Sequence, residues 1–108
     1  MKTHAVAEKL GLRVAAGELP EEYTGVYVGD LLSRAMSHVT SGDIWITIMN
    51  NVNVIAVASL TEAACVILAE GVEMDDETLA AAKARDVAVM TCSMTAYEIC
   101  RVLALSES

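Results

Sequence analysis

The sequence predicts an α/β domain of three layers, in which helices cover both faces of a mostly parallel central sheet. Short runs of β-branched and apolar residues alternate with helical patterns from Gly25 onward, which is typical of this class. The run Ile44–Ile48 is bulky at successive positions, as a strand covered on both faces requires. A length of 108 residues fits one hydrophobic core, so residues 1–108 are expected to form a single domain.

The first quarter of the chain predicts a helix, a strand and a loop. Residues 3–10 place apolar side chains at helical spacing, and Gly11 is a suitable C-terminal stop. Leu12–Ala16 reads as a strand. Glu18–Thr24 holds the only proline among three glutamates, which favours a loop.

The next elements are a short strand, a helix and a buried strand. Gly25–Gly29 is the short strand, and Asp30 is placed to cap the helix that follows. The apolar stripe expected on that helix consists of Leu31, Leu32, Ala35, Met36 and Val39. Val52–Leu60 is apolar almost throughout, so its periodicity fits strand or helix. A crossover between the parallel strands Ile44–Ile48 and Cys65–Leu68 requires a helix there.

The last third repeats this alternation. Acidic residues from Asp75 onward open a helix and Lys83 lies near its end, as the helix dipole favours. Val87–Met90 is the next strand. Thr95–Glu98 matches a capping box, which predicts a final helix over Ala96–Leu105.

The composition favours self-association and argues against several partners. Hydrophobic residues make up 55% of the chain, a surplus for a small monomer, and we expect a homodimer interface to bury it. Trp45, Tyr27 and Met49 are the candidates for that interface. The apolar runs are too short to span a membrane. A net charge of −8 without a Lys/Arg cluster opposes binding to nucleic acid or anionic lipid.

The N-terminus and the cysteines indicate a reducing compartment. Charged residues interrupt the first 14 residues before an apolar segment can form, so we expect no secretion signal and a cytoplasmic protein. Cys65, Cys92 and Cys100 are an odd number with no metal-ligand spacing. They are expected to be reduced thiols, and neither a disulfide framework nor a zinc site is predicted.

Polar residues follow the predicted strands where a parallel sheet collects its carboxyl ends, an edge at which ligands tend to bind. The candidate ligand-binding residues there are Asn50, Asn51, Asn53, Glu70, Gly71, Ser93 and Thr95. The alternative is that these residue types only cap helices and form turns. No Lys or Arg is expected on this edge apart from Arg34. Because nucleotide motifs are also missing, no tight phosphate site is predicted.

Other reactive side chains give no strong motif, and no catalytic residue, metal site or cofactor is predicted. Cys92 lies between a strand end and a helix start, where a thiol pKa can fall, yet Glu98 occupies the position of the arginine in a phosphatase-type loop. The acidic residues between Glu62 and Glu77 match no calcium loop and fit a solvated helix start. His4 and His38 are isolated and fit surface positions.

The order and spacing of the segments Ile46–Ala58, Val66–Asp75 and the closing strand with its capping box resemble the DRTGG domain family over about Gly25–Leu103. Family members carry a charged turn where this chain has Met49–Asn53, and a TGG-like turn where it has Ala69-Glu70-Gly71. Amides therefore replace charges in the first turn, and only the last glycine of the second is kept.

The resemblance implies a regulatory or accessory module without catalytic activity of its own. Such modules occur beside CBS domains, in some phosphotransacetylases and pyrophosphatases, and their members tend to associate. The leading hypothesis is a homodimeric regulatory domain with a possible protein partner. Two alternatives stay open: sensing of a small ligand, with adenine nucleotides first because of the CBS association, and a thiol enzyme that uses Cys92.

Overall fold

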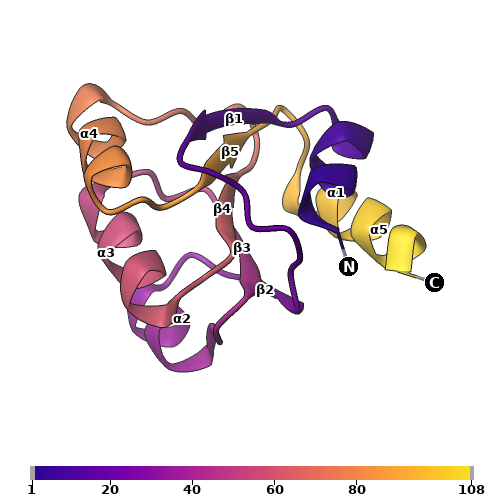
Figure 1. Cartoon of the computed structure of the whole chain (residues 1–108), viewed down its shortest axis with the longest axis horizontal. Helices are drawn as coiled ribbons and strands as arrows, with labels where there is room; N and C mark the ends of the chain where they lie inside the picture. Colours follow the sequence, from indigo (N-terminus) through magenta and orange to yellow (C-terminus); the bar gives the residue numbers. More distant parts are fainter. Residues whose placement is uncertain (1, 108) are drawn as a thin grey trace.

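The computed structural model describes residues 2–107, in which five strands form one sheet between two helical layers (Figure 1). The strands are β1 (Arg13–Ala16), β2 (Gly25–Val28), β3 (Asp43–Thr47), β4 (Cys65–Leu68) and β5 (Val89–Thr91). The helices are α1 (Thr3–Leu10), α2 (Leu32–His38), α3 (Val52–Thr61), α4 (Asp76–Ala84) and α5 (Ala96–Glu107). Helices α2, α3 and α4 lie on one side of the sheet, and α1 with α5 on the other.

The sheet has the order β1-β5-β4-β3-β2 and is parallel from β2 to β5. Strand β1 pairs antiparallel with β5, and Arg13 lies opposite Thr91. The predicted three-layer architecture with a mostly parallel sheet is confirmed. The helix α3 is likewise the crossover that two adjacent parallel strands require.

Strand β3 divides the core between the two faces of the sheet. Ile44 and Ile46 pack with α1 and α5, whereas Trp45 packs with α2, α3 and α4. Trp45 is completely buried, and its indole N–H donates to the carbonyl of Gly29 at 2.9 Å. The proposal that Trp45 contributes to an interface is therefore wrong, because an indole that is buried and bonded within the chain presents nothing to a partner.

Asp30 does not cap α2, contrary to the prediction. Its Oδ1 accepts from the hydroxyl of Thr47 at 2.7 Å and from the backbone N–H of Ile48 at 3.0 Å. The helix starts after Leu31, without a side-chain cap. The buried hydroxyl of Thr47 needs a partner, and Asp30 supplies it while joining the ends of β2 and β3.

The apolar stripe expected on α2 is only partly buried. Ala35 and Val39 lie in the core, but Leu31 is 60% and Met36 44% exposed. The helix has seven residues and packs mainly against α3, and Ala35 is the residue that it buries. Among the described helices, none is long and apolar enough to cross a membrane.

Candidate functional site

The carboxyl ends of the parallel strands meet at one edge, where the loops after β4 and β5 are joined through their backbones. The N–H of Glu70 donates to Met94 O and that of Gly71 to Cys92 O, both at 2.8 Å. Glu70 and Gly71 both have positive φ, 59° and 75°. This turn therefore lies directly beside the loop that carries Ser93, and its amide donors are used within the protein.

The three asparagines after β3 have three different roles. Asn51 is the N-cap of α3, since its Oδ1 accepts from the backbone N–H groups of Asn53 at 3.0 Å and Val54 at 3.3 Å. The side-chain amide of Asn50 donates to Glu73 O at 2.6 Å and holds the loop that enters α4. The side chain of Asn53 is exposed and makes no hydrogen bond to residues 2–107.

The predicted capping box at the start of α5 is confirmed. Glu98 accepts from the N–H of Thr95 at 3.0 Å and from its hydroxyl at 3.1 Å, while the N–H of Glu98 donates to the Thr95 hydroxyl at 3.2 Å. These bonds, first the one from the Thr95 backbone, hold the pKa of Glu98 below its usual range. Ser93, just before the box, is exposed.

Arg13 lies on this edge, which corrects the expectation that Arg34 alone could bring a cation there. Because β1 is antiparallel to β5, its first residue reaches the edge at which the other strands end. The Arg13 guanidinium donates to Glu73 Oε1 at 2.8 Å and to the Thr91 hydroxyl at 3.4 Å. No pattern in Leu12–Ala16 signals the direction of the strand, so this arginine could not be placed from the sequence.

A cavity of about 270 Å³ opens beside this arginine. Its lining combines the ion pair with apolar side chains of β1 and α4: Arg13, Val14, Ala15, Glu73, Met74, Leu79 and Thr91. Arg13 and Glu73 are each 68% exposed, so their pairing is weak and open to exchange with a ligand. Asn50 touches the same loop through the carbonyl of Glu73.

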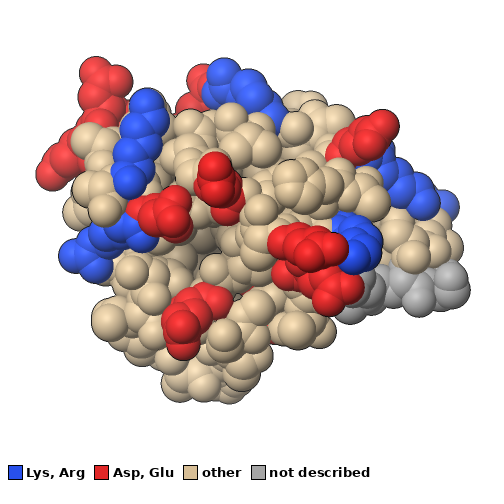
Figure 2. All heavy atoms as spheres, in the orientation of Figure 1, with Lys and Arg blue, Asp and Glu red and all other residues tan. Residues whose placement is uncertain are grey.

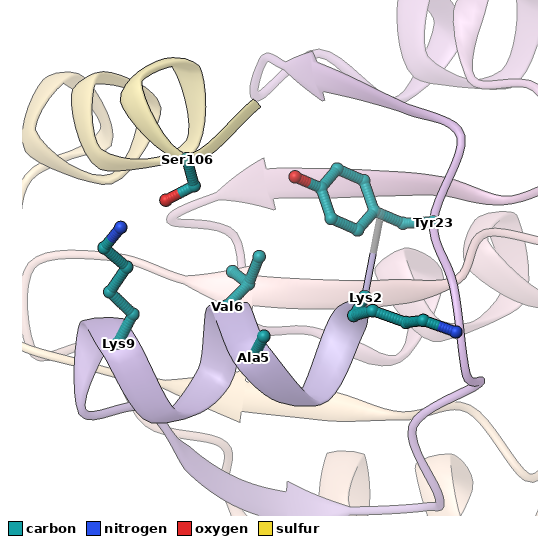
Figure 3. Close-up of a pocket in the computed structure, with 6 residues that line it drawn as sticks. All are labelled: Lys2, Ala5, Val6, Lys9, Tyr23 and Ser106. Carbon is teal, nitrogen blue, oxygen red and sulfur yellow. The ribbon is translucent and has the colours of Figure 1, made fainter. Parts of the chain in front are cut away.

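A second cavity, of about 310 Å³, lies where α1 approaches α5 and Tyr23, away from the predicted site residues (Figure 3). Lys9 extends toward Ser106, while Lys2 points away from it. The Lys2 ammonium is held by Glu21 at 2.9 Å and Glu22 at 3.5 Å, and these contacts raise its pKa. One of the two lysines is thus already neutralised, and the cavity has little attraction for an anion.

The thiols show the opposite of nucleophilic activation. Burial, with a smaller contribution from the charge of Glu98, raises the pKa of the half-buried Cys92 thiol. Burial also raises the pKa of Cys100, and it raises that of Cys65 to about 12. An activated thiol needs a lowered pKa, so this direction counts against a nucleophilic Cys92.

The face of the molecule seen in Figure 2 offers no basic patch for a polyanion. Acidic side chains are spread over the visible face, and no area gathers Lys and Arg (Figure 2). Among residues 2–107, no three His, Cys, Asp or Glu side chains are grouped so that they could hold a metal ion.

Comparisons with known proteins agree with this architecture. The family model of the DRTGG domain matches residues 5–106. A crystal structure of the CBS and DRTGG domains of the regulatory region of Clostridium perfringens pyrophosphatase, complexed with the activator diadenosine tetraphosphate, is similar with a TM-score of 0.73 and 16% identity. The similarity covers 93% of this chain and 44% of the other, so this chain spans less than half of that protein's chain. No curated protein sequence matches. The fold is thus shared with part of this solved regulatory region, and the match of the family model places the chain in the DRTGG domain family.

Proposed function

We propose that this protein is a non-catalytic regulatory or accessory domain that acts in the cytoplasm through homodimerisation and contact with a protein partner. The observation that carries the proposal is the apolar surface that the fold leaves uncovered. Large hydrophobic side chains are at least 36% exposed at ten positions of the described surface. They are Val14, Val26, Val28, Leu31, Met36, Ile48, Val52, Leu60, Tyr97 and Leu105. A regulatory domain uses such a surface to transmit a state to another subunit or protein.

Sedimentation velocity over a concentration series tests the self-association. We expect a species of twice the 11.4 kDa chain mass at micromolar concentration. A folded monomer at several hundred micromolar would contradict the proposal. Performing the series in low and high salt adds a second check, because an apolar interface between acidic chains should persist or strengthen as repulsion is screened.

A second candidate function is the sensing of a small ligand at the polar edge. Two observations favour it: the similar pyrophosphatase region was solved with a dinucleotide activator, and the cavity beside Arg13 opens on this edge. The candidate residues are Asn50, Asn51, Asn53, Glu70, Gly71, Ser93 and Thr95, now joined by Arg13. Asn51 and Thr95 are used as caps, so the side chains that remain for a ligand include those of Asn53, Glu70, Ser93 and Arg13.

Thermal denaturation with diadenosine tetraphosphate, ATP, ADP and AMP at millimolar concentration tests this candidate. A ligand at a hundred times its dissociation constant stabilises the fold by about 2.7 kcal/mol, which is readily measured as a higher Tm. The substitution Arg13→Ala should abolish the shift. Arg101→Ala, which removes the same charge from the exposed surface of α5, is the control and should retain it. If none of the four compounds moves the Tm of the wild type, adenine-nucleotide sensing is ruled out.

A further inference from the structure

We propose that the free edge of β2 binds β2 of a second copy of this chain, so that two sheets join across a twofold axis. This inference rests on the homodimerisation proposed above and names its surface. Strand β2 ends the sheet order, and no strand lies beyond it among residues 2–107 (Figure 1). An edge strand exposes backbone N–H and C=O groups that another strand can complete.

The two edges of the sheet differ in how they are protected. Strand β1 carries Arg13 and has an irregular register between Val14 and Ala16, both of which discourage pairing with another strand. Strand β2, Gly25–Val28, has no charge, no proline and a regular register with β3. A soluble protein normally blunts such an edge, so the unprotected β2 indicates a strand that is covered in use.

The side chains of β2 are also left uncovered on the face of α1 and α5. Val26 lies opposite Ile44 and Val28 opposite Ile46, so both valines point to that face. They are 36% and 48% exposed, whereas the two isoleucines are completely buried. Helices α1 and α5 therefore stop short of β2. The groove that remains, about 170 Å³, is lined by Val26, Cys100, Leu103 and Ala104.

Backbone geometry defines how a second copy would pair. The N–H of Gly29 donates to Ile46 O, so alternation along β2 directs the backbone groups of Val26 and Val28 away from β3. When two β2 strands pair antiparallel around a twofold axis perpendicular to the sheet, opposed residues point to the same face of the joined sheet. An even-numbered residue therefore lies opposite an even-numbered residue, and an odd-numbered residue opposite an odd-numbered one. The pairing that matches the outward groups sets Val26 against Val28 of the partner copy. Tyr27 then lies opposite its own counterpart.

Charge explains why the occupant is a second copy. The chain has a net charge of −8, so most pairs of its surfaces repel each other, but β2 itself is uncharged. The acids that flank it are already engaged: Glu22 contacts Lys2 at 3.5 Å and Asp30 binds the end of β3. Self-pairing thus brings to the contact only carboxylates that already have a hydrogen-bond or ion-pair partner within their own chain.

The area that a stable dimer interface must bury requires α5 to contribute to the contact. A stable interface buries about 800 Å² on each partner, roughly one-seventh of the 5728 Å² surface of this chain. Four residues of strand cannot supply that area alone. The groove between β2 and α5 extends the contact with apolar surface. Val28 of the partner copy, which lies opposite Val26 in this pairing, would close it.

The test compares the same substitution on the two edge strands. Val28→Lys should raise the dimer dissociation constant at least about a hundredfold, because each ammonium would be placed against the apolar Val26 of the partner copy and lose its hydration there. Val14→Lys, on the 45% exposed valine of β1, is the matched control and should leave the dimer unchanged. Sedimentation gives the dissociation constants, and circular dichroism checks that each variant is folded.

Tyr27→Cys supplies a positive test, because its readout is the formation of a covalent dimer and not the loss of one. Opposed residues of a non-hydrogen-bonded antiparallel pair have Cα atoms about 4.5 Å apart, within disulfide range. Mild oxidation should therefore give a reducible covalent dimer, whereas Val14→Cys and the wild type should stay uncrosslinked. If the wild type is monomeric, homodimerisation and this surface both fail. If the wild type and Val28→Lys are equally dimeric and Tyr27→Cys does not crosslink, only the β2 surface is wrong.

Discussion

The substitution Asn51→Ala separates the structural from the ligand-binding interpretation of the polar edge. Asn51 Oδ1 accepts two backbone N–H groups at the start of α3, at 3.0 and 3.3 Å. The first turn of α3 has no acidic residue that could replace this acceptor. Removing the cap should therefore leave both donors to solvent and destabilise the domain.

Loss of an N-cap asparagine costs about 1 kcal/mol, with a range of roughly 0.5–2 kcal/mol. For a domain of this size, that corresponds to a fall in Tm of roughly 4 °C. Urea denaturation followed by circular dichroism gives the free energy directly. The m-value should stay constant, because the surface exposed on unfolding is nearly the same.

The control is Asn53→Ala, two residues further on, whose side chain is exposed and unbonded within the described range. It should change stability by less than about 0.5 kcal/mol. Equal destabilisation by both substitutions would refute the assignment of the cap to Asn51. If Asn53→Ala leaves stability intact but removes a nucleotide-induced Tm shift, the residue belongs to a ligand site.

Three further outcomes follow from the structure. Glu98 has a lowered pKa, so the bonds from Thr95 stabilise the fold above the ordinary carboxyl pKa of about 4. This stabilisation is lost as the pH falls through the folded-state pKa. The stability advantage of wild type over Glu98→Gln should therefore vanish in acid. Alkylation of Cys92 should be slower than that of a free cysteine at pH 7, and Cys65 should react only on unfolding; fast alkylation below pH 8 would contradict this. Trp45→Phe removes a buried indole hydrogen bond and leaves a void, so urea denaturation should show a loss of about 2–3 kcal/mol.

The architecture could be predicted because local pattern and global fold agree along most of the chain. The capping box at Thr95 and the crossover over Val52–Thr61 follow from local spacing and from the needs of parallel strands. Asp30 shows where this agreement ends. Its position before a helix favours a cap, yet the buried hydroxyl of Thr47, 17 residues away, competes for the same carboxylate and binds it.

Candidate site residues were harder to predict, because the pattern locates the edge but does not show which groups there are already bonded. Arg13 reaches it only through the antiparallel direction of β1, and Glu73 meets it from a loop 60 residues later in the chain. Such long-range contacts leave no periodic signal in a single sequence. Trp45 failed as an interface candidate because residues of α2, α3 and α4 bury it, which agrees with the expectation that its strand is covered on both faces.

The backbone N–H groups at this edge already have acceptors within the protein, which limits the kinds of ligand that the edge could bind. The N–H groups of Glu70 and Gly71, which a bare phosphate would need, donate to the loop after β5. Arg13 is the cation found there, and it shares its charge with Glu73. A phosphate would therefore have to displace a carboxylate on a chain that already carries a net charge of −8. A ligand with a neutral polar part for Asn53 and Ser93 and a single anionic group for Arg13 meets less opposition. If the denaturation assay detects a ligand, comparing a nucleoside with its nucleotide would show whether the anionic group adds to binding or opposes it.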